Sequence, residues 1–358
     1  MLTIKSKSDC RYDILSLGEV MLRFDPGEER IKSTRHFRVW EGGGEYNVAR
    51  GLSKVFEQRA ALVTGIAKNE IGLLLEDLIL QGGVDISHSK WFDYDGYGHS
   101  VRNGLNFVER GFGVRGAVGC SDRGHSATSK IKPGDIDWDY IFGELGVRWF
   151  HTGGIFAALS SEAHEVALEA MMSAKKFGTI VSYDLNYRAS LWQKRGGLEQ
   201  CRAVNRALAP YVDVMIGFPG LLGIELEGES QNNLDTLGFE KLINKSIEQF
   251  PNLKVFSSTV RQVKSASQND WSAVSWGDSK FYQSNAISNL EILDRVGGGD
   301  GFAAGLIYGL MEKDDLQLAV EYGNAHGALA MTTPGDNSMA SLTEVECLLA
   351  GSSGVTLR

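Results

Sequence analysis

The sequence predicts an α/β fold in which a mostly parallel central sheet lies between helices and carries a small β lid. Strand-like and helix-like segments alternate along most of the chain, and residues 85–132 interrupt this alternation. Strands that alternate with helices form parallel sheets with helices on their faces. Since 43% of the 358 residues are hydrophobic and 23% are charged, the chain can bury a large core. We expect a single domain, 1–358, with a lid from about 31–41 and 86–132.

The N-terminal part shows the alternation clearly. Residues 12–18 form a short apolar run that ends in glycine, which is typical of a buried strand. Apolar residues recur at three- and four-residue steps across 45–56, which predicts an amphipathic helix. The next predicted elements are a strand at 60–66 and a helix at 70–80.

The stretch 85–132 differs in composition. It is rich in Gly, Ser, Arg and aromatic residues and contains short alternating pieces such as 99–108, so we interpret it as a small β excursion. A long irregular loop is the alternative, although such loops are uncommon in compact domains. Beyond it, strands are expected at 148–151, 179–184 and 212–216 and near 255, 272 and 281, and helices at 161–177, 197–208, 299–311, 316–332 and 343–349.

Composition argues against several kinds of partner. The net charge of −9 disfavours a nucleic-acid surface, which needs a basic stripe. No run of about 18 apolar residues occurs, so we expect no membrane span and a cytoplasmic location. The cysteines lack CxxC spacing and the histidines lack HxxxH spacing, so free thiols and no His/Cys metal site are expected.

The strongest chemical signal is the run Gly297-Gly298-Gly299-Asp300 at the start of a predicted helix. Consecutive glycines allow a tight turn whose N–H groups converge, and the helix N-terminus adds partial positive charge. Such a turn can stabilise charge during phosphoryl transfer, and Asp300 could take the proton of an attacking hydroxyl. A plain helix cap is the alternative role for Asp300. Neither a GxxxxGK[ST] nor a GxGxxG sequence occurs at the glycine runs.

Two further motifs place polar groups near predicted strand and helix ends. After the strand 179–184, residues Asp184, Asn186 and Arg188 alternate, at the sheet edge where ligands bind in α/β folds. Arg188 could hold a carboxylate or phosphate, and an internal Asp184–Arg188 pair is the alternative. Near the N-terminus, glycines 42–44 lead into a helix on which Asn47 could bind a substrate hydroxyl; a plain turn is the alternative.

With these motifs, the chain resembles the ribokinase-like (PfkB) carbohydrate kinases, and among them the 2-keto-3-deoxygluconate kinases. Both signatures of the family are present, one from Gly42-Gly43 to Asn47-Val48-Ala49 and one from Asp294 to Asp300, followed by Phe302-Ala-Ala-Gly305. The similarity covers nearly the whole chain. It implies a three-layer sandwich with a β lid over the sugar, ATP and Mg²⁺ as cofactors, and phosphate transfer to a sugar acid, 2-keto-3-deoxygluconate, at its 6-hydroxyl.

The resemblance also implies roles for individual residues. The catalytic base would be Asp300, and the anion hole would be Gly297, Gly298 and Gly299. The sugar acid would be bound by Gly43, Asn47, Arg123 and Arg188. The nucleotide would be bound by Arg261, Asn324 and Asp336, and magnesium would be placed by Asp184 and Asn186. A monovalent cation beside Asp294, as in some relatives, and a homo-oligomer formed through the lid are left open.

Three positions depart from the family pattern. Residues 217–221 lack the acidic residue that helps arrange magnesium in many members. The Gly-rich nucleotide loop is replaced by 257–261, which places Arg261 near a phosphate. Ser121 and Asp122 replace two tyrosines that precede the substrate arginine in ketodeoxygluconate kinases. A kinase for another sugar or nucleoside, and a sugar- or nucleotide-binding protein with little turnover, are therefore the alternatives.

Overall fold

The computed structural model describes residues 2–225 and 236–352. Its main sheet consists of β1 (Tyr12–Leu17), β4 (Ala60–Val63), β6 (Val84–Asp85), β10 (Val147–Gly153), β11 (Ile180–Asp184), β12 (Val214–Ile216), β13 (Val255–Ser265), β14 (Gln268–Gly277), β15 (Lys280–Gln283) and β16 (Ile287–Glu291). The order is β15-β14-β13-β12-β11-β10-β1-β4-β6, with β16 also beside β14. From β6 to β13 all neighbours are parallel, and only the β14 pairs are antiparallel. The predicted mostly parallel sheet is confirmed.

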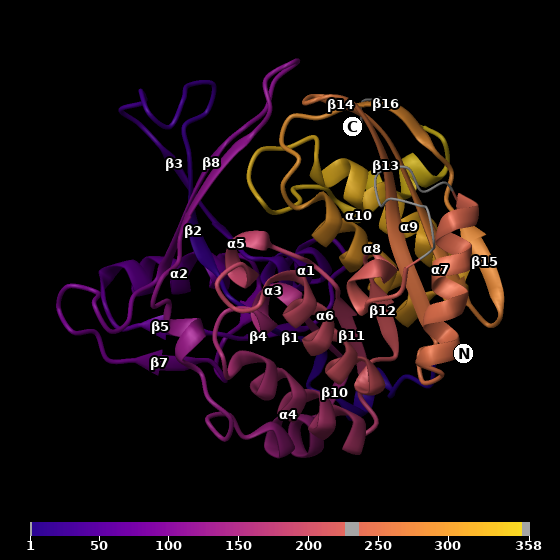
Figure 1. Ribbon diagram of the computed structural model, residues 1–358, viewed down its shortest axis with the longest axis horizontal. Coiled ribbons are helices and arrows are strands. Elements are labelled where there is room, and N and C mark those ends of the chain that lie inside the picture. Colours follow the sequence, from indigo (N-terminus) through magenta and orange to yellow (C-terminus); the bar gives the residue numbers. More distant parts are fainter. Residues whose placement is uncertain (1, 226–235, 353–358) are drawn as a thin grey trace.

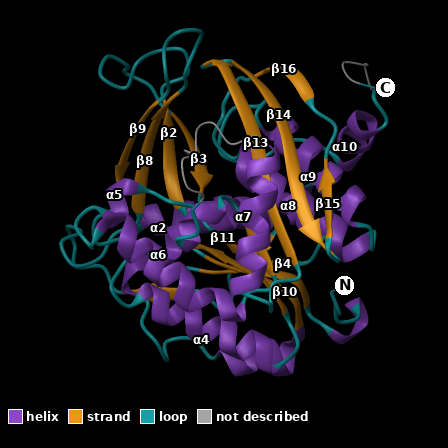
Figure 2. Ribbon diagram, turned by 45° about the vertical axis from the view of Figure 1, so that its right-hand side comes forward, coloured by secondary structure: helices purple, strands orange, loops and turns teal. Residues whose placement is uncertain are grey.

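Helices cover both faces of this sheet (Figures 1 and 2). One face packs against α1 (Gly44–Lys54), α2 (Glu70–Gln81), α8 (Gly298–Glu312), α9 (Leu316–Ala330) and α10 (Leu342–Leu349). The other packs against α3 (Gly154–Ala157), α4 (Ala163–Lys176), α5 (Ala189–Trp192), α6 (Gly197–Leu208) and α7 (Thr236–Gln249). Successive strand residues enter opposite cores, as Trp149 and Phe150 do, because strand side chains alternate between faces. The three-layer sandwich is therefore confirmed.

Shorter helical turns connect these elements. They are η1 (Lys7–Asp9), η2 (Ala127–Lys130), the π-helical η3 (Tyr140–Gly146), η4 (Ala209–Tyr211) and η5 (Pro219–Leu222). Several of the longer helices begin where the sequence provides a cap. Asn69 accepts a hydrogen bond from Gly72 N at 2.9 Å, and Asp315 accepts one from Leu318 N at 3.0 Å, which satisfies N–H groups in the first turns of α2 and α9.

A second, smaller sheet stands apart from the main one (Figure 2). It contains β2 (Met21–Asp25), β3 (Arg38–Gly42), β8 (Gly104–Glu109) and β9 (Val118–Asp122), in the order β3-β2-β8-β9. The rings of Phe24 and Phe107 stack in it with centroids 4.9 Å apart. The expected β excursion is present, and the sheet also includes β2, which precedes the predicted range 31–41. The strand β9 is an exposed edge, and pairing of two subunits through it stays a prediction.

Some segments differ from the expectations. The predicted strand at 60–66 is split into β4 and β5 (Gly65–Ala67), and β5 pairs with β7 (Lys90–Phe92). The helix α7 was not predicted. Residues 257–261, expected as the nucleotide loop, lie inside β13 and are paired with β14 throughout. Among the described residues, no helix combines the length and apolarity needed to cross a bilayer.

Candidate active site

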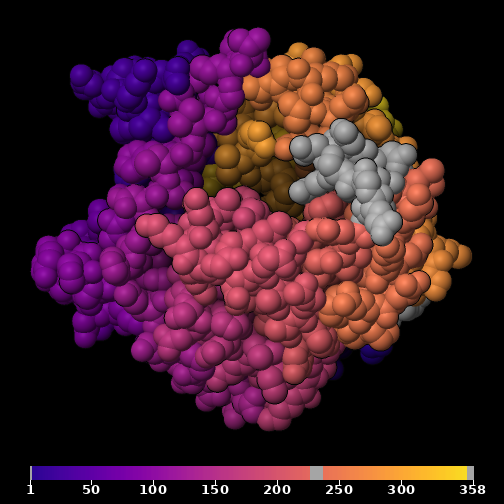
Figure 3. Space-filling view, in the orientation of Figure 1, coloured from indigo at the N-terminus to yellow at the C-terminus, as the bar shows by residue number. Residues whose placement is uncertain are grey.

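An open cavity of ≈ 1170 Å³ lies at the carboxyl ends of β11 and β12 and along residues 258–263 of β13. Figure 3 shows a hollow between the small sheet, the β13–β16 region and the front helices, with C-terminal residues at its floor. Its wall includes six of the predicted site residues, namely Asp184, Asn186, Arg188, Arg261, Gly298 and Gly299. The carboxyl edge of a parallel sheet is where α/β proteins bind ligands.

The glycine turn forms the N-terminus of α8. Gly297 is the N-cap residue with φ 83°, a left-handed conformation that glycine adopts without strain. A Cβ at Gly297 would also lie 1.9 Å from the carbonyl oxygen of Asp336, so only glycine fits there. The N-cap position makes no side-chain capping bond, and Asp300 lies in the first turn. The plain helix-cap interpretation of Asp300 is therefore wrong.

Asp300 is hydrogen-bonded to the other predicted signature. Asn47 Nδ2 donates to Asp300 Oδ2 at 2.6 Å, and Gly43 N donates to Asn47 Oδ1 at 3.2 Å. A Cβ at Gly43 would lie 1.8 Å from the carbonyl oxygen of Glu19, so this turn needs a glycine as well. The structure thus brings together residues from the start of α1 and the start of α8.

Three carboxyl groups lie near one another at this place and are called the Asp300 group: Glu45, Asp184 and Asp300. Burial raises the pKa of Asp300 to about 6, although the Asn47 hydrogen bond favours its charged form. Burial, and then the charge of Asp300, raise the pKa of Asp184 to about 7. Burial raises the pKa of Glu45 to about 8, and the charges of Asp300 and Asp184 contribute. Perturbed carboxyl groups beside a cavity are typical of catalytic and ion-binding sites.

These carboxyl groups fit the magnesium ion that the resemblance implies. Glu45 is 3% exposed, and its Oε2 atom has no hydrogen-bond partner among the described residues. Like charges that raise one another's pKa are stabilised by a cation. Within the described ranges, no three or more His, Cys, Asp or Glu side chains are arranged to enclose a metal ion. Magnesium held by one or two carboxylates, substrate phosphates and water is consistent with this arrangement.

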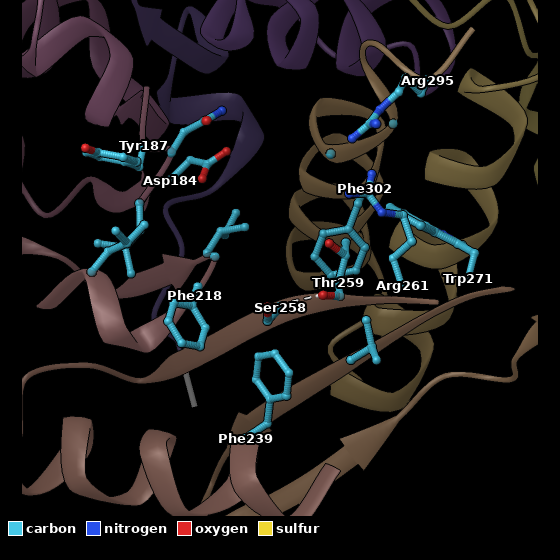
Figure 4. A pocket seen from close by; sticks show the side chains of 18 of the residues that line it. Asp184, Tyr187, Phe218, Phe239, Ser258, Thr259, Arg261, Trp271, Arg295 and Phe302 are labelled. Atoms are coloured by element: carbon cyan, nitrogen blue, oxygen red, sulfur yellow. Dashed lines mark hydrogen bonds between the residues drawn. The ribbon is translucent and has the colours of Figure 1, made fainter. Parts of the chain in front are cut away.

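Arginines supply positive charge on the cavity wall. In Figure 4, Asp184 and Tyr187 lie on one side of the cavity, and Arg261 and Arg295 on the other. Burial and the neighbouring charge of Arg295 lower the pKa of Arg261 below its ordinary value. Among the described residues, no carboxylate forms an ion pair with Arg188, Arg261 or Arg295. Unpaired guanidinium groups in a cavity can bind an anion such as a phosphate or carboxylate.

Arg188 does not form the internal pair with Asp184 that sequence considerations left open. Its Nη1 donates to the side chain of Asn186 and, at 3.1 Å, to the carbonyl oxygen of Tyr187. Its side chain is exposed at the cavity wall. Arg188 is therefore free to form charge-assisted hydrogen bonds with a ligand.

Arg123 is in a different environment. It follows β9 and forms an ion pair with Glu19 at 2.8 Å. The two residues that replace the family's tyrosines also have partners, since Ser121 Oγ donates to Asn106 at 2.9 Å and Asp122 pairs with Arg102. Arg123 lies outside the main cavity wall, and its charge is already balanced by a buried carboxylate.

Two predicted nucleotide-binding residues lie away from the cavity wall. Asn324 is buried and is not part of the cavity wall, and its carbonyl oxygen accepts a hydrogen bond at 3.1 Å from Nε1 of Trp271, which is part of that wall. Asp336 lines a different cavity of ≈ 200 Å³ and is hydrogen-bonded to Arg23. Contacts of Asn324 and Asp336 with a nucleotide stay predictions.

Glu45 and Arg23 were missed in the sequence. Glu45 lies within the signature between Gly44 and Tyr46, and its burial is the feature that identifies it. Arg23 and Asp25 alternate with apolar residues on β2, and this unusual placement of charges in a strand was the available signal. We call Arg23 and the three acidic residues around it the Arg23 group: Arg23, Asp25, Asp294 and Asp336.

Comparisons with known proteins agree with this geometry. A curated 2-dehydro-3-deoxygalactonokinase of Haloferax volcanii is 26% identical over 342 residues, covering 95% of this chain and 97% of the relative. A 5-dehydro-2-deoxygluconokinase of Clostridium botulinum is 25% identical, covering 92% and 90%. The crystal structure of a 2-dehydro-3-deoxygluconokinase of Thermotoga maritima has a TM-score of 0.85 at 34% identity, covering 94% of this chain and 99% of that one.

The sequence profile described as the pfkB family carbohydrate kinase matches residues 12–343. This match spans both signatures, the small sheet and the glycine turn. Kinases of this family use ATP with Mg²⁺. The chain belongs to the PfkB family of carbohydrate kinases.

Proposed function

We propose that this kinase transfers the γ-phosphate of ATP to a hydroxyl of a 2-keto-3-deoxy sugar acid, with 2-keto-3-deoxygluconate and its 6-phosphate as the expected substrate and product. One observation carries the proposal: Asp300 is hydrogen-bonded to Asn47 at 2.6 Å, and it follows Gly298 and Gly299, which line the cavity, in the first turn of α8. A base and an anion-stabilising turn lie side by side, as phosphoryl transfer to an alcohol requires.

The proposed steps follow from these residues. Asp300 in its charged form accepts the proton of the sugar hydroxyl as the hydroxyl oxygen attacks the γ-phosphorus. Asn47 keeps the Asp300 carboxylate in position through its Nδ2 hydrogen bond. The N–H groups at the α8 N-terminus stabilise charge that develops on the phosphoryl oxygens, and Arg261 and Arg295 approach the polyphosphate.

Magnesium, when bound, would neutralise charge on the phosphate oxygens. Asp184 is the residue proposed to hold it, with Asn186 nearby on the same wall. Residues 217–221 supply no carboxylate for magnesium. Glu45, which lies near Asp184 and Asp300, adds an acidic group to the site in their place.

The acidic character of the substrate is supported by Arg188. It is exposed at the cavity and has no carboxylate partner among the described residues. Names of the relatives also support it, since 2-dehydro-3-deoxygalactonokinase and 2-dehydro-3-deoxygluconokinase are both named for sugar acids. A guanidinium group binds a carboxylate with two hydrogen bonds.

The Arg123–Glu19 pair favours a second candidate, a neutral sugar. Because Glu19 already balances the charge of Arg123, that arginine adds little attraction for a carboxylate. Glu19 could instead accept hydrogen bonds from sugar hydroxyls. The two candidates differ in the role of Arg188, which would bind the carboxylate of a sugar acid and would have no such group to bind in a neutral sugar.

The test is ADP release with a panel of 2-keto-3-deoxygluconate, 2-keto-3-deoxygalactonate, 5-keto-2-deoxygluconate, fructose, ribose and adenosine. We expect the keto-deoxy acids to give the highest kcat/KM. We also expect Arg188→Leu to raise KM for the acid by about tenfold, and Arg123→Leu to raise it less, since a charge-assisted hydrogen bond contributes about 1.5–3 kcal/mol. An unchanged KM in Arg188→Leu would contradict the acid assignment, and sugar binding without any ADP release would indicate a binding protein.

A further inference from the structure

A guanidinium group lies buried between the small sheet and the loops that flank the glycine turn. Arg23 is on β2 and is 0% exposed. Its Nη1 donates to Asp336 and its Nη2 to Asp294, which are 313 and 271 positions away in the sequence. Asp25 Oδ2 lies 4.0 Å from the same Nη2. One side chain of the small sheet therefore joins two separate C-terminal segments.

Both carboxylates bound by Arg23 are connected to the glycine turn. Asp294 accepts hydrogen bonds from Val296 N at 3.2 Å and from Gly335 N at 3.4 Å. The carbonyl oxygen of Asp336 packs so close to Gly297 that a Cβ there would lie 1.9 Å from it. A displacement of either segment would therefore move the N–H groups that begin α8.

A monovalent cation beside Asp294, which the family resemblance leaves open, does not fit these residues. A buried monovalent cation would need carboxylate oxygen atoms of Asp294 and Asp336 to balance its charge. Both carboxylates already accept hydrogen bonds from the guanidinium of Arg23, and a second cation at this place would be repelled by it.

We propose that Arg23 is a built-in cation of the phosphoryl-transfer site. It is a positioning residue that holds the Asp294 and Asp336 segments against the glycine turn, and it makes the kinase independent of K⁺ and Na⁺. The inference rests on the proposed role of the glycine turn. Its effect on stability, however, can be measured without any substrate, so it can be decided even if the proposed sugar acid is not phosphorylated.

The first experiment uses the unmodified protein. Thermal unfolding is measured in KCl, NaCl and tetramethylammonium chloride at equal ionic strength. The three midpoints are expected to agree within about 1 °C, because an ion that binds only the native state would raise the midpoint by mass action. ADP release should likewise be equal in the three salts. A rise in midpoint or rate that is specific to K⁺ or Na⁺ would overturn the proposal.

The second experiment removes the guanidinium. Arg23→Ala leaves three buried carboxylates facing an empty space. We expect a lower unfolding midpoint that rises again with millimolar K⁺ or guanidinium, together with a severalfold recovery of kcat. The matched control is Arg110→Ala, which removes a guanidinium 3.7 Å from Asp25 that contacts neither Asp294 nor Asp336. An Arg23→Ala protein that responds to these cations no more than Arg110→Ala does would contradict the proposal.

Arg23→Lys keeps the proposal testable if Arg23→Ala does not fold. Lysine keeps the charge but lacks the planar fork that reaches two carboxylates at once. We expect a folded protein whose kcat falls by about tenfold while KM for ATP stays within about twofold, as for an interaction realised mainly in the transition state. A wild-type kcat in Arg23→Lys would show that the fork is not needed to position the turn.

Discussion

Two groups of three carboxylates lie around the glycine turn, with Asp300 in the first turn of α8 and Asp294 hydrogen-bonded to Val296 just before it, and their charges are balanced differently. In the Arg23 group, Asp25, Asp294 and Asp336 surround a guanidinium supplied by the chain. In the Asp300 group, no Lys or Arg forms an ion pair with a carboxylate among the described residues. Burial raises the pKa of Asp294 and of Asp336 in the first group, and the bound guanidinium of Arg23 opposes this rise. In the second group burial raises the pKa values of Glu45, Asp184 and Asp300 to about 8, 7 and 6, and the charge of Arg188 opposes the rise at Asp184 and Asp300 without forming an ion pair.

The difference separates a structural role from a functional one. A buried carboxylate that is paired with a fixed cation can hold two segments together. Whether the pair raises or lowers the free energy of unfolding depends on its geometry. Carboxylates without such a partner destabilise the native state when all are charged, and they bind cations and protons from solution. The Asp300 group is therefore suited to proton transfer and magnesium binding, and the Arg23 group to positioning.

The largest expected effect is on turnover. Asp300→Asn should lower kcat by a factor of about 10²–10⁴, the usual contribution of a general base. The substitution keeps an oxygen that can accept the Asn47 hydrogen bond, so the unfolding midpoint should change little. Steady-state ADP release with the best sugar acid measures the effect, and Asp315→Asn, at the N-cap of α9, is the matched control. Near-normal turnover of Asp300→Asn would show that Asp300 is not the base.

The next effect is on stability and should have opposite signs in the two groups. Asp294→Asn should lower the free energy of unfolding by about 1–3 kcal/mol, because the buried guanidinium of Arg23 loses a charged acceptor. Asp184→Asn should raise that free energy at pH 8 by about 1 kcal/mol, as substitutions at destabilised functional sites often do. Urea unfolding without magnesium measures both values. A change in the free energy of unfolding with the same sign in both variants would contradict the difference between the two groups.

The sign for Asp184 follows from its pKa. A folded-state pKa of about 7, above the ordinary value of 3.8, means that the native state holds an extra proton between these values. Stability therefore falls as pH rises through this range, and the penalty is fully present at pH 8.

A third prediction concerns magnesium. Asp184→Asn should raise the Mg²⁺ concentration for half-maximal activity by about tenfold, because removal of one carboxylate ligand weakens the site. Asp294→Asn should leave this concentration unchanged. Titration of ADP release with Mg²⁺ at fixed ATP measures both. Asp213→Asn, which removes a carboxylate bound to Lys175 away from the cavity, is a further control. An equal shift in all three variants would place magnesium elsewhere.

The smallest effect is a shift in pH dependence. The acid limb of kcat/KM should lie near the Asp300 pKa of about 6, with Asp184 coupled to it, because the base must be charged to accept a proton. Asn47→Ala removes the hydrogen bond that favours charged Asp300, so the limb should move to higher pH. Asn252→Ala, whose amide binds backbone carbonyls elsewhere, should not move it. A shift to lower pH in Asn47→Ala would contradict the assignment.

Local patterns were sufficient for most of the fold. The hydrophobic periodicity of α1 and α4 and the apolar runs of β1 and β10 follow directly from burial on one or two faces, so their positions were predicted closely. The strand β2 and the helix α7 were missed. β2 carries Arg23 and Asp25 at buried positions, so its charges conceal the strand pattern until their partners are known.

The sequence by itself determined the reaction class, because the two signatures hold the glycines, Asn47 and Asp300 that a phosphoryl-transfer turn needs. Only the tertiary structure decided which charges meet. Arg23 faces Asp294 and Asp336, Arg123 is balanced by Glu19, and Arg188 stays without a carboxylate partner among the described residues. Charge balance depends on distances of a few ångströms between segments far apart in the chain, and no local pattern encodes those distances.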